Sequence, residues 1–431
     1  MVRTAPAKRK ATARNAFYAQ SGGVTAVINA SACGLIEEAR KHEDRIGKVF
    51  AGRDGIIGAL TEDLIDTSRE SATAIAKLRT TPGGAFGSCR YKFKPFEQSP
   101  AEYLRLIEVF KAHDIGYFFY NGGNDSMDTA HKLSTVSARL GYPVACIGIP
   151  KTVDNDLVGT DSCPGFGSVA KYVALSMREA GMDVASMART STKVFVLEVM
   201  GRHAGWITAA CGLAAAREGD APHVLLFPEV PFDEAAFLAR VRDSVSRHGY
   251  CAIAVSEGLR NPKGQFLSET GLTDAFGHAQ LGGVAPLIAQ LVKEKLGYKY
   301  HWAVADYLQR AARHVASSID VRQSYKLGQA AVRMAVSGQS GIMMALIRTS
   351  NKPYRWRIAG LPLADVANHE KKLPPDFITP DGFHITAACR QYLTPLISGE
   401  DYPPYRSGLP DYVRLKNVPA RKKLAESFTI R

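Results

Sequence analysis

The chain has 431 residues, of which 46% are hydrophobic and 38 are glycine, a composition that is typical of a globular enzyme with two large lobes and excludes a disordered or fibrous protein. No apolar stretch approaches the roughly 20 residues needed to cross a bilayer, and the basic N-terminus lacks the apolar core of a secretory signal. We therefore expect no membrane partner and a cytoplasmic location, with an organelle transit peptide as the alternative. Seven cysteines without a C-x-x-C pair agree with reduced thiols in a cytoplasm.

The two ends of the chain hold most of the formal net charge of +13. Residues 1–14 contain five basic residues and no acidic residue, and residues 414–431 contain six basic residues and one acidic residue. No DNA- or RNA-binding motif accompanies these tails. We therefore expect solvated ends and no nucleic-acid partner.

Apolar runs of strand length recur along the chain, and each ends in a glycine-rich or charged loop. Between them lie helical stretches such as residues 24–39, where apolar side chains follow a period of 3.6 residues. Near-continuous apolar strands separated by helices predict an α/β fold with mainly parallel, doubly wound sheets in two lobes. The predicted strands include residues 15–20, 115–120, 143–149, 193–199 and 251–255.

Two later stretches are less regular. Residues 296–310 predict a further strand followed by a loop, and the sequence after Leu346 is interrupted by proline-rich breakers. We expect that last region to be a peripheral extension.

Ligands of doubly wound sheets bind at the carboxyl ends of the strands, and glycine-rich loops occur at these ends here. Gly22 and Gly23 follow the first strand and can direct backbone N–H groups towards a phosphate at a helix N-terminus, although a tight turn without a ligand is the alternative. Gly123 repeats this design, followed by Asn124, Asp125 and Ser126, for which helix capping is the alternative. A third glycine cluster ends in Arg90.

Residues 149–156, IPKTVDND, place a cation, a hydroxyl and two carboxylates directly after an apolar strand. Phosphoryl transfer requires positioning and charge neutralisation, which Lys151 and the glycine loops supply. The attacking hydroxyl must also lose a proton, and Asp154 is the candidate base. The alternative for Asp154 is an Asx-turn in the loop. A Walker A loop and a protein-kinase catalytic loop are both absent from the sequence.

Five motifs in this order and spacing resemble the phosphofructokinases, and within them the pyrophosphate-dependent branch. They are GGNDS, PKTVDND, MGRHAGW, SEG and YLQR, and the resemblance covers roughly residues 15–345. It implies two similar Rossmann-like lobes with the active site in the cleft between them. It also implies reversible, Mg²⁺-assisted phosphoryl transfer from pyrophosphate to the 1-hydroxyl of fructose 6-phosphate.

The resemblance assigns roles to the motif residues. Asp154 would deprotonate the sugar hydroxyl, with Thr152 donating to the transferred phosphoryl group and Asp156 near the sugar. The implied substrate contacts on the other side are Met200, Gly201 and Arg202, the carboxylate of Glu257, and the 6-phosphate clamp of Tyr307 and Arg310. Lys193 falls where the family places a basic residue that reaches the substrate of a neighbouring subunit, which agrees with a homodimer or homotetramer.

Donor choice depends on Asp125 and Lys151, because ATP-using relatives have glycine at both positions. A carboxylate at 125 would oppose the α-phosphate of a nucleotide, and Lys151 would hold pyrophosphate. The alternative is that Asp125 and Lys151 pair with each other. The family's magnesium-associated acid is Asn124 here, which is a weaker ligand, so Asp125, Asp154 or the pyrophosphate itself would hold more of the metal.

The expected organisation is a basic tail over 1–14, a pyrophosphate lobe over 15–163 completed by 307–345, a sugar lobe over 164–306, and an extension over 346–431. The predicted function is that of a pyrophosphate-dependent phosphofructokinase. The first alternative is an ATP-dependent member, and the second is a non-catalytic sugar-phosphate-sensing subunit.

Overall fold

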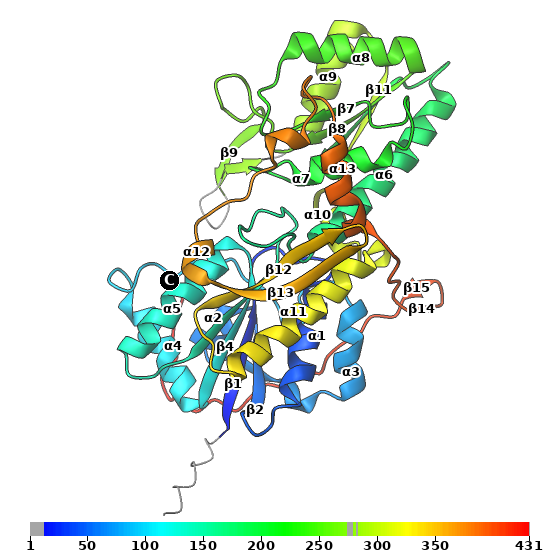
Figure 1. The fold of residues 1–431 in the computed structure, drawn as a ribbon. Helices are drawn as coiled ribbons and strands as arrows, with labels where there is room; N and C mark the ends of the chain where they lie inside the picture. The colour runs from blue at the N-terminus through cyan, green and yellow to red at the C-terminus, as the bar shows by residue number, and fades with distance from the viewer. Residues whose placement is uncertain (1–12, 274–278, 282, 431) are drawn as a thin grey trace, which may run out of the picture.

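The computed structural model describes residues 13–430, apart from 274–278 and 282. Two sheets divide the described chain into two lobes (Figure 1). Lobe 1 holds a seven-stranded sheet in the order β13-β12-β5-β4-β1-β2-β3. Its strands are β1 (Arg14–Gln20), β2 (Ile46–Gly52), β3 (Leu64–Asp66), β4 (Ile115–Gly122), β5 (Ala145–Pro150), β12 (Ile342–Asn351) and β13 (Tyr354–Pro362).

The five central strands of lobe 1 run parallel, and only the outer strands β3 and β13 pair antiparallel with their neighbours. Lobe 2 holds a four-stranded parallel sheet in the order β11-β6-β8-β7. Its strands are β6 (Val194–Val199), β7 (Val224–Leu226), β8 (Cys251–Ser256) and β11 (Tyr300–Val304). The predicted α/β class with mainly parallel sheets is confirmed.

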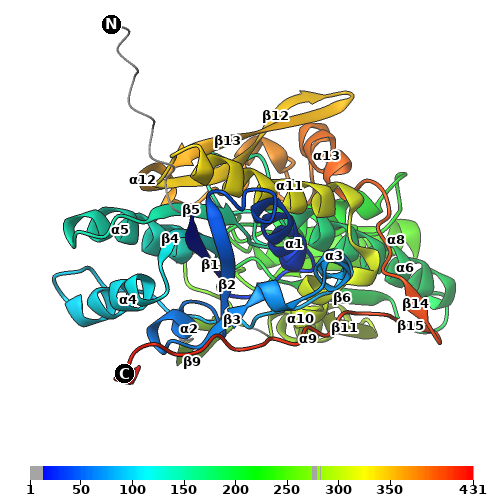
Figure 2. The same ribbon diagram turned by 90° about the horizontal axis from the view of Figure 1, so that it is seen from below.

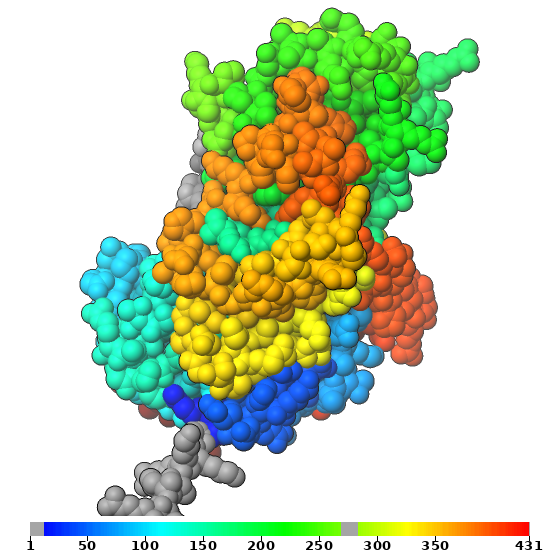
Figure 3. All heavy atoms as spheres, in the orientation of Figure 1, coloured from blue at the N-terminus to red at the C-terminus, as the bar shows by residue number. Residues whose placement is uncertain are grey.

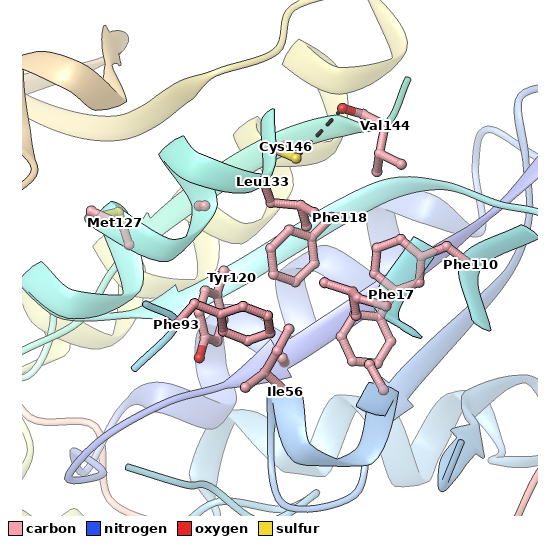
Figure 4. Close-up of a cluster of buried hydrophobic side chains, with 14 of the residues drawn as sticks. Phe17, Ile56, Phe93, Phe110, Phe118, Tyr120, Met127, Leu133, Val144 and Cys146 are labelled. Carbon is pink, nitrogen blue, oxygen red and sulfur yellow. Dashed lines mark hydrogen bonds between the residues drawn. The ribbon is translucent and has the colours of Figure 1, made fainter. Parts of the chain in front are cut away.

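Helices cover both faces of the lobe 1 sheet, as alternating side chains of β1 require. Phe17 points into a core with α2 (Ile56–Leu60), α4 (Pro100–Ala112) and α5 (Asn124–Arg139), where aromatic rings stack against one another (Figure 4). Tyr18 points to the opposite face. That face is covered by α1 (Ile28–Ala39) and α11 (Ser318–Val336).

The sheet of lobe 2 is also covered on both faces. One core contains α6 (Phe166–Met187), α7 (Trp206–Cys211) and α13 (Ala387–Leu393), and the other contains α8 (Glu234–His248) and α9 (Val284–Leu296). None of the described helices is long and apolar enough to span a membrane. The remaining short elements are α3 (Ala72–Lys77), β9 (Glu269–Thr273), β10 (Ala279–Leu281), α10 (Asp306–Ala311), α12 (Leu363–Val366), β14 (Tyr405–Arg406) and β15 (Leu409–Pro410).

The structure differs from the sequence-based expectation in the region after Leu346. Strands β12 and β13 belong to the lobe 1 sheet, so this region is not merely peripheral. The expected loop after β11 is a short helix, α10. The basic C-terminal tail is not a solvated end either, because Leu424 packs against the lobe 1 core and the backbone of Lys423 donates to the buried carboxylate of Glu62. Figure 2 shows this last segment running along lobe 1.

One stretch of the C-terminal extension crosses between the lobes. Helix α12 contributes Leu363 and Val366 to a core of lobe 1, whereas Leu373 is buried in a core of lobe 2. We call residues 367–373 between them the interlobe strap. Figure 3 shows the orange residues of the extension covering the junction of the two lobes on this face.

Candidate active site

A hollow of about 1060 Å³ is lined by residues of both lobes and of the interlobe strap. It collects all the side chains and loops predicted from the sequence except Lys193 and Gly201. The carboxyl ends of β1, β4 and β5 reach it from lobe 1, and those of β6, β8 and β11 reach it from lobe 2. Parallel strands therefore place the motifs, which lie far apart in the sequence, around one cleft.

The first glycine loop brings cations close to its backbone. The Lys151 ammonium donates to the Gly23 carbonyl over 2.6 Å. A Cβ at Gly22, whose φ is +73°, would lie 3.3 Å from this nitrogen, and a Cβ at Gly23 would lie 2.6 Å from the Arg310 guanidinium. Glycine at both positions thus leaves space for two cationic side chains beside the loop.

Burial lowers the pKa of Lys151 to about 8, and the charges of Arg310 and Arg90 act in the same direction. The carboxylates of Asp154 and Asp156 oppose this shift. Three cations gathered beside glycine-rich backbone repel one another unless an anion joins them. This part of the cleft is therefore suited to a polyphosphate.

The second glycine loop leads into α5, whose first turn contains Asp125 and the buried side chain of Ser126. Gly123 is the residue before the helix. The Asp125 carboxylate accepts from the ammonium of Lys92 over 2.7 Å, and this contact raises the pKa of Lys92. Asp125 and Lys151 thus have separate partners, and the direct pairing considered from the sequence is not the arrangement in the structure.

The loop after β5 holds the candidate base. The Asp154 backbone N–H donates to the Thr152 hydroxyl over 3.1 Å, so this turn is closed by the side chain of Thr152 and not by that of Asp154, as the Asx-turn considered from the sequence would require. Burial, together with the nearby carboxylates of Asp156 and Glu257, raises the pKa of Asp154 to about 7. A carboxyl group with a pKa near 7 is well placed to exchange a proton at neutral pH.

The side chain of Asp156 has one oxygen without a hydrogen-bond partner. Burial raises its pKa, and the charge of Glu370 contributes in the same direction. Its Oδ1 atom is buried and has no hydrogen-bond partner among the described residues. Buried polar atoms are normally paired, so an unpaired oxygen in the cleft is available to a substrate or a metal ion.

Hydrogen bonds within lobe 2 shape its side of the cleft. Gly201 has a φ of +135°, and its N–H donates to the Glu257 carboxylate over 3.3 Å while its carbonyl accepts from the Ser256 hydroxyl over 2.6 Å. The Met200 N–H donates to the side chain of Gln309 over 3.3 Å. These bonds fix the backbone on which Arg202 is carried into the cleft.

Tyr307 and Arg310 lie on α10 and form a pair. The Arg310 guanidinium lies 3.7 Å from the centre of the Tyr307 ring, and the Tyr307 side chain is exposed. Arg310 also approaches Gly23 of lobe 1, so it spans the two sides of the cleft. Lys193 lies elsewhere: its ammonium donates to the carbonyl of Ala188, outside the cleft lining.

Sequence reasoning missed the contribution of the interlobe strap. Asn368 and Glu370 line the cleft, although neither lies in a recognisable motif. Both polar atoms of the Asn124 side chain bond to this strap, since its Oδ1 accepts from the Asn368 N–H and its Nδ2 donates to the His369 carbonyl. The only signal in the sequence was the unusual amide at position 124.

Comparison with known proteins agrees with this geometry. The family model described as phosphofructokinase matches residues 15–335, and the chain belongs to this family. The chain is 66% identical to the pyrophosphate–fructose 6-phosphate 1-phosphotransferase of Methylococcus capsulatus over 97% of its own length and 100% of the relative's. It is 64% identical to the protein of the same name from Halomonas elongata, over 96% and 98% of the two chains.

A solved structure extends the similarity to three dimensions. The pyrophosphate-dependent phosphofructokinase from Nitrosospira multiformis superimposes with a TM-score of 0.90 at 62% identity. The match covers 97% of this chain and 100% of that one. The family model ends at residue 335, whereas the matches to these relatives include the C-terminal extension almost entirely.

Proposed function

We propose that this chain catalyses reversible phosphoryl transfer from pyrophosphate to the 1-hydroxyl of fructose 6-phosphate, giving fructose 1,6-bisphosphate and phosphate. Relatives that match nearly the whole chain carry the name of this activity. The observation that carries the proposal is that one cleft holds the cations of lobe 1, the carboxylate of Asp154, and Met200 and Arg202 of lobe 2. A non-catalytic subunit does not require the base, and the carboxylate of Asp125 disfavours ATP as the donor.

The two lobes bind different substrates in this proposal. Lobe 1 holds pyrophosphate with Lys151, Arg90 and the backbone of its two glycine loops. Lobe 2 holds fructose 6-phosphate with Glu257, Arg202 and the pair of Tyr307 and Arg310. Asp154 accepts the proton of the 1-hydroxyl, and Thr152 donates to the phosphoryl group in transit.

Asp125 excludes nucleotides. A carboxylate about 4 Å from an α-phosphate costs ~1 kcal/mol in water and several times that in a partly desolvated cleft. The ion pair with Lys92 orients this carboxylate in the first turn of α5. Lys151 would then compensate the charge of the pyrophosphate.

Members of the family generally use Mg²⁺, and we propose the same for this chain. The described residues contain no group of three or more His, Cys, Asp or Glu side chains that would form a metal cage. Mg²⁺ commonly binds through phosphate oxygens and one or two carboxylates, and the open oxygen of Asp156 fits this need. Asp125 is a further candidate, whereas the strap bonds of Asn124 favour a different role for that side chain.

A donor comparison tests the function. With Mg²⁺ and fructose 6-phosphate, the protein is expected to turn over pyrophosphate and not ATP. Asp154→Asn should lower kcat on the order of 10³-fold because a positioned base contributes about this much. Asp365→Asn, at an exposed position on α12, serves as the control and should leave kcat unchanged. Turnover with ATP alone would contradict the role of Asp125, and an active Asp154→Asn variant would contradict the role of the base.

A homodimer or homotetramer and a cytoplasmic location stay predictions. Strand β11 is an edge of its sheet, and Trp302 on it and Leu308 after it are exposed apolar side chains, which supports self-association there. All seven cysteines are buried free thiols, as a reducing compartment allows. Light scattering on the purified protein measures the oligomer.

A further inference from the structure

The interlobe strap touches three parts of the active site. It contacts the second glycine loop of lobe 1 through Asn124, the loop of the candidate base through Lys371, and the sugar lobe through Trp206 and Glu229. The strap lies outside residues 15–335, which the family model matches. These contacts are hydrogen bonds to backbone and side-chain groups, in addition to the apolar packing of Leu373 in lobe 2.

The contact with Asn124 requires an amide. Its Oδ1 accepts from the backbone N–H of Asn368 over 2.5 Å, and its Nδ2 donates to the carbonyl of His369 over 2.7 Å. Asn368 has a φ of +64°, and its own side chain donates to Asp128 over 3.2 Å, which fixes the strap on α5. An aspartate at 124 could accept but not donate, and it would place a carboxylate against a carbonyl oxygen.

Lys371 fixes the loop that carries Asp154 and Asp156. Its ammonium donates to the carbonyls of Thr160 and Asp161, each over 3.0 Å, and to the side chain of Asn155 over 3.3 Å. Its backbone N–H donates to the carbonyl of Asp156 over 2.7 Å.

Asn155 connects this loop to Lys371 and to Cys163. It has a φ of +55°, in the left-handed region that costs energy for most residues. Its side chain also accepts from the Cys163 N–H over 2.9 Å, closing the loop on itself. Lys371 therefore supports the one residue between the two aspartates of the site.

The strap ends on lobe 2. The Trp206 indole N–H donates to the Lys371 carbonyl over 3.0 Å, and the Leu373 N–H donates to Glu229 over 3.2 Å. Glu229 also accepts from Gly205, which follows the sugar-side segment in the sequence. The strap thus links the second glycine loop (the donor loop), the loop that carries Asp154 (the base loop) and the part of lobe 2 that contains Met200, Gly201 and Arg202.

We propose that the interlobe strap is a positioning element of the active site, in which Asn124 and Lys371 set the donor loop and the base loop against each other and against lobe 2. Lys371 is a positioning residue that acts through Asp154, and Asn124 is a positioning residue rather than a metal ligand. This inference rests on the proposed role of Asp154.

A double-mutant cycle tests the role of Lys371. Lys371→Met is expected to lower kcat at least tenfold with KM values within threefold of the wild type, and Lys371→Arg should recover part of the loss. The exposed Lys293→Met, on α9 and outside the strap, is the matched control and should leave kcat unchanged. In the Asp154→Asn background, Lys371→Met should cause little further loss, because the group that it positions is already disabled. An equal loss in both backgrounds would mean general structural damage and would overturn the inference.

Asn124→Asp separates positioning from metal binding. We expect faster hydrogen–deuterium exchange in peptides covering 367–373 and a lower kcat/KM for pyrophosphate, with Mn²⁺ affinity, measured by its paramagnetic resonance, within threefold of the wild type. Tighter Mn²⁺ binding with unchanged exchange would overturn the assignment of Asn124. An active Asp154→Asn variant would refute the proposed base itself, whereas an inactive Asp154→Asn beside a fully active Lys371→Met would refute the strap alone.

Discussion

At the scale of single residues, the charge of Lys151 depends on pH in the range near 8. Burial and two neighbouring arginines lower its pKa to about 8, and only the ammonium form attracts pyrophosphate. The lowered pKa means that this charge is complete well below pH 8 and is lost as the pH rises through 8. We therefore expect kcat/KM for pyrophosphate to fall above pH 8 in saturating Mg²⁺.

The control is Lys151→Arg, which keeps its charge at all these pH values. Its kcat/KM for pyrophosphate should start lower but show no decline near pH 8. A decline shared by both proteins would assign the pH dependence to pyrophosphate or its Mg²⁺ complex instead of Lys151.

That the site residues gather in one cleft could be predicted, because most of their motifs of glycine, cation and carboxylate directly follow strands. The partners of those residues could not. Asp125 pairs with Lys92 rather than with Lys151. Asn124 bonds to Asn368 and His369, which lie 244 and 245 residues further along the chain. Such contacts depend on the position of an irregular segment that is distant in the sequence, and hydrophobic periodicity does not predict that position.

At the scale of elements, the crossing of α1 and α11 depends on two glycines. A Cβ at Gly34 would lie 2.1 Å from the Tyr325 carbonyl oxygen, and one at Gly328 would lie 2.1 Å from the Ser31 carbonyl oxygen. Both obstacles are backbone, so the helices would have to move apart. This crossing covers one face of the lobe 1 sheet.

We expect Gly34→Ala to lower the free energy of unfolding by about 1–3 kcal/mol, the usual cost of overpacking, despite the better helix propensity of alanine. Urea unfolding followed by circular dichroism measures this. Arg322→Ala, at an exposed position on α11, should change stability by less than about 0.5 kcal/mol. A stabilised Gly34→Ala variant would show that the helices are not in close contact.

The same elements show what sequence patterns determine. The 3.6-residue period predicted a helix over 24–39, and α1 begins at Ile28 because residues 24–27 form the turn that follows the glycine pair. The parallel strands were evident from their continuous apolar runs. Strands β12 and β13 were not, because β12 is continuously buried only over 343–346, the edge strand β13 is only partly buried or exposed, and prolines interrupt this region.

At the scale of the whole molecule, the C-terminal extension stabilises both lobes. Its strands complete the lobe 1 sheet, its strap joins the lobes, and α13 packs in lobe 2. Its basic tail returns to lobe 1, where the Lys423 and Leu424 N–H groups donate to Glu62, a buried carboxylate that also contacts His113. These hydrogen bonds lower the pKa of Glu62 against the opposing effect of burial.

Two leucines in this extension differ in burial, and their substitution tests whether the basic tail packs on lobe 1. Leu424 packs against the lobe 1 core, whereas Leu409 on β15 is 72% exposed. Leu424→Ala should therefore lower the free energy of unfolding by about 1–2 kcal/mol, less than for a fully buried leucine, and Leu409→Ala by almost nothing. Equal stability of the two variants in urea would mean that the tail is a solvated basic arm, and binding of the protein to DNA would then become the relevant measurement. A loss in Leu424→Ala alone makes the positive charge of the tail part of the folded surface of lobe 1 rather than a free arm.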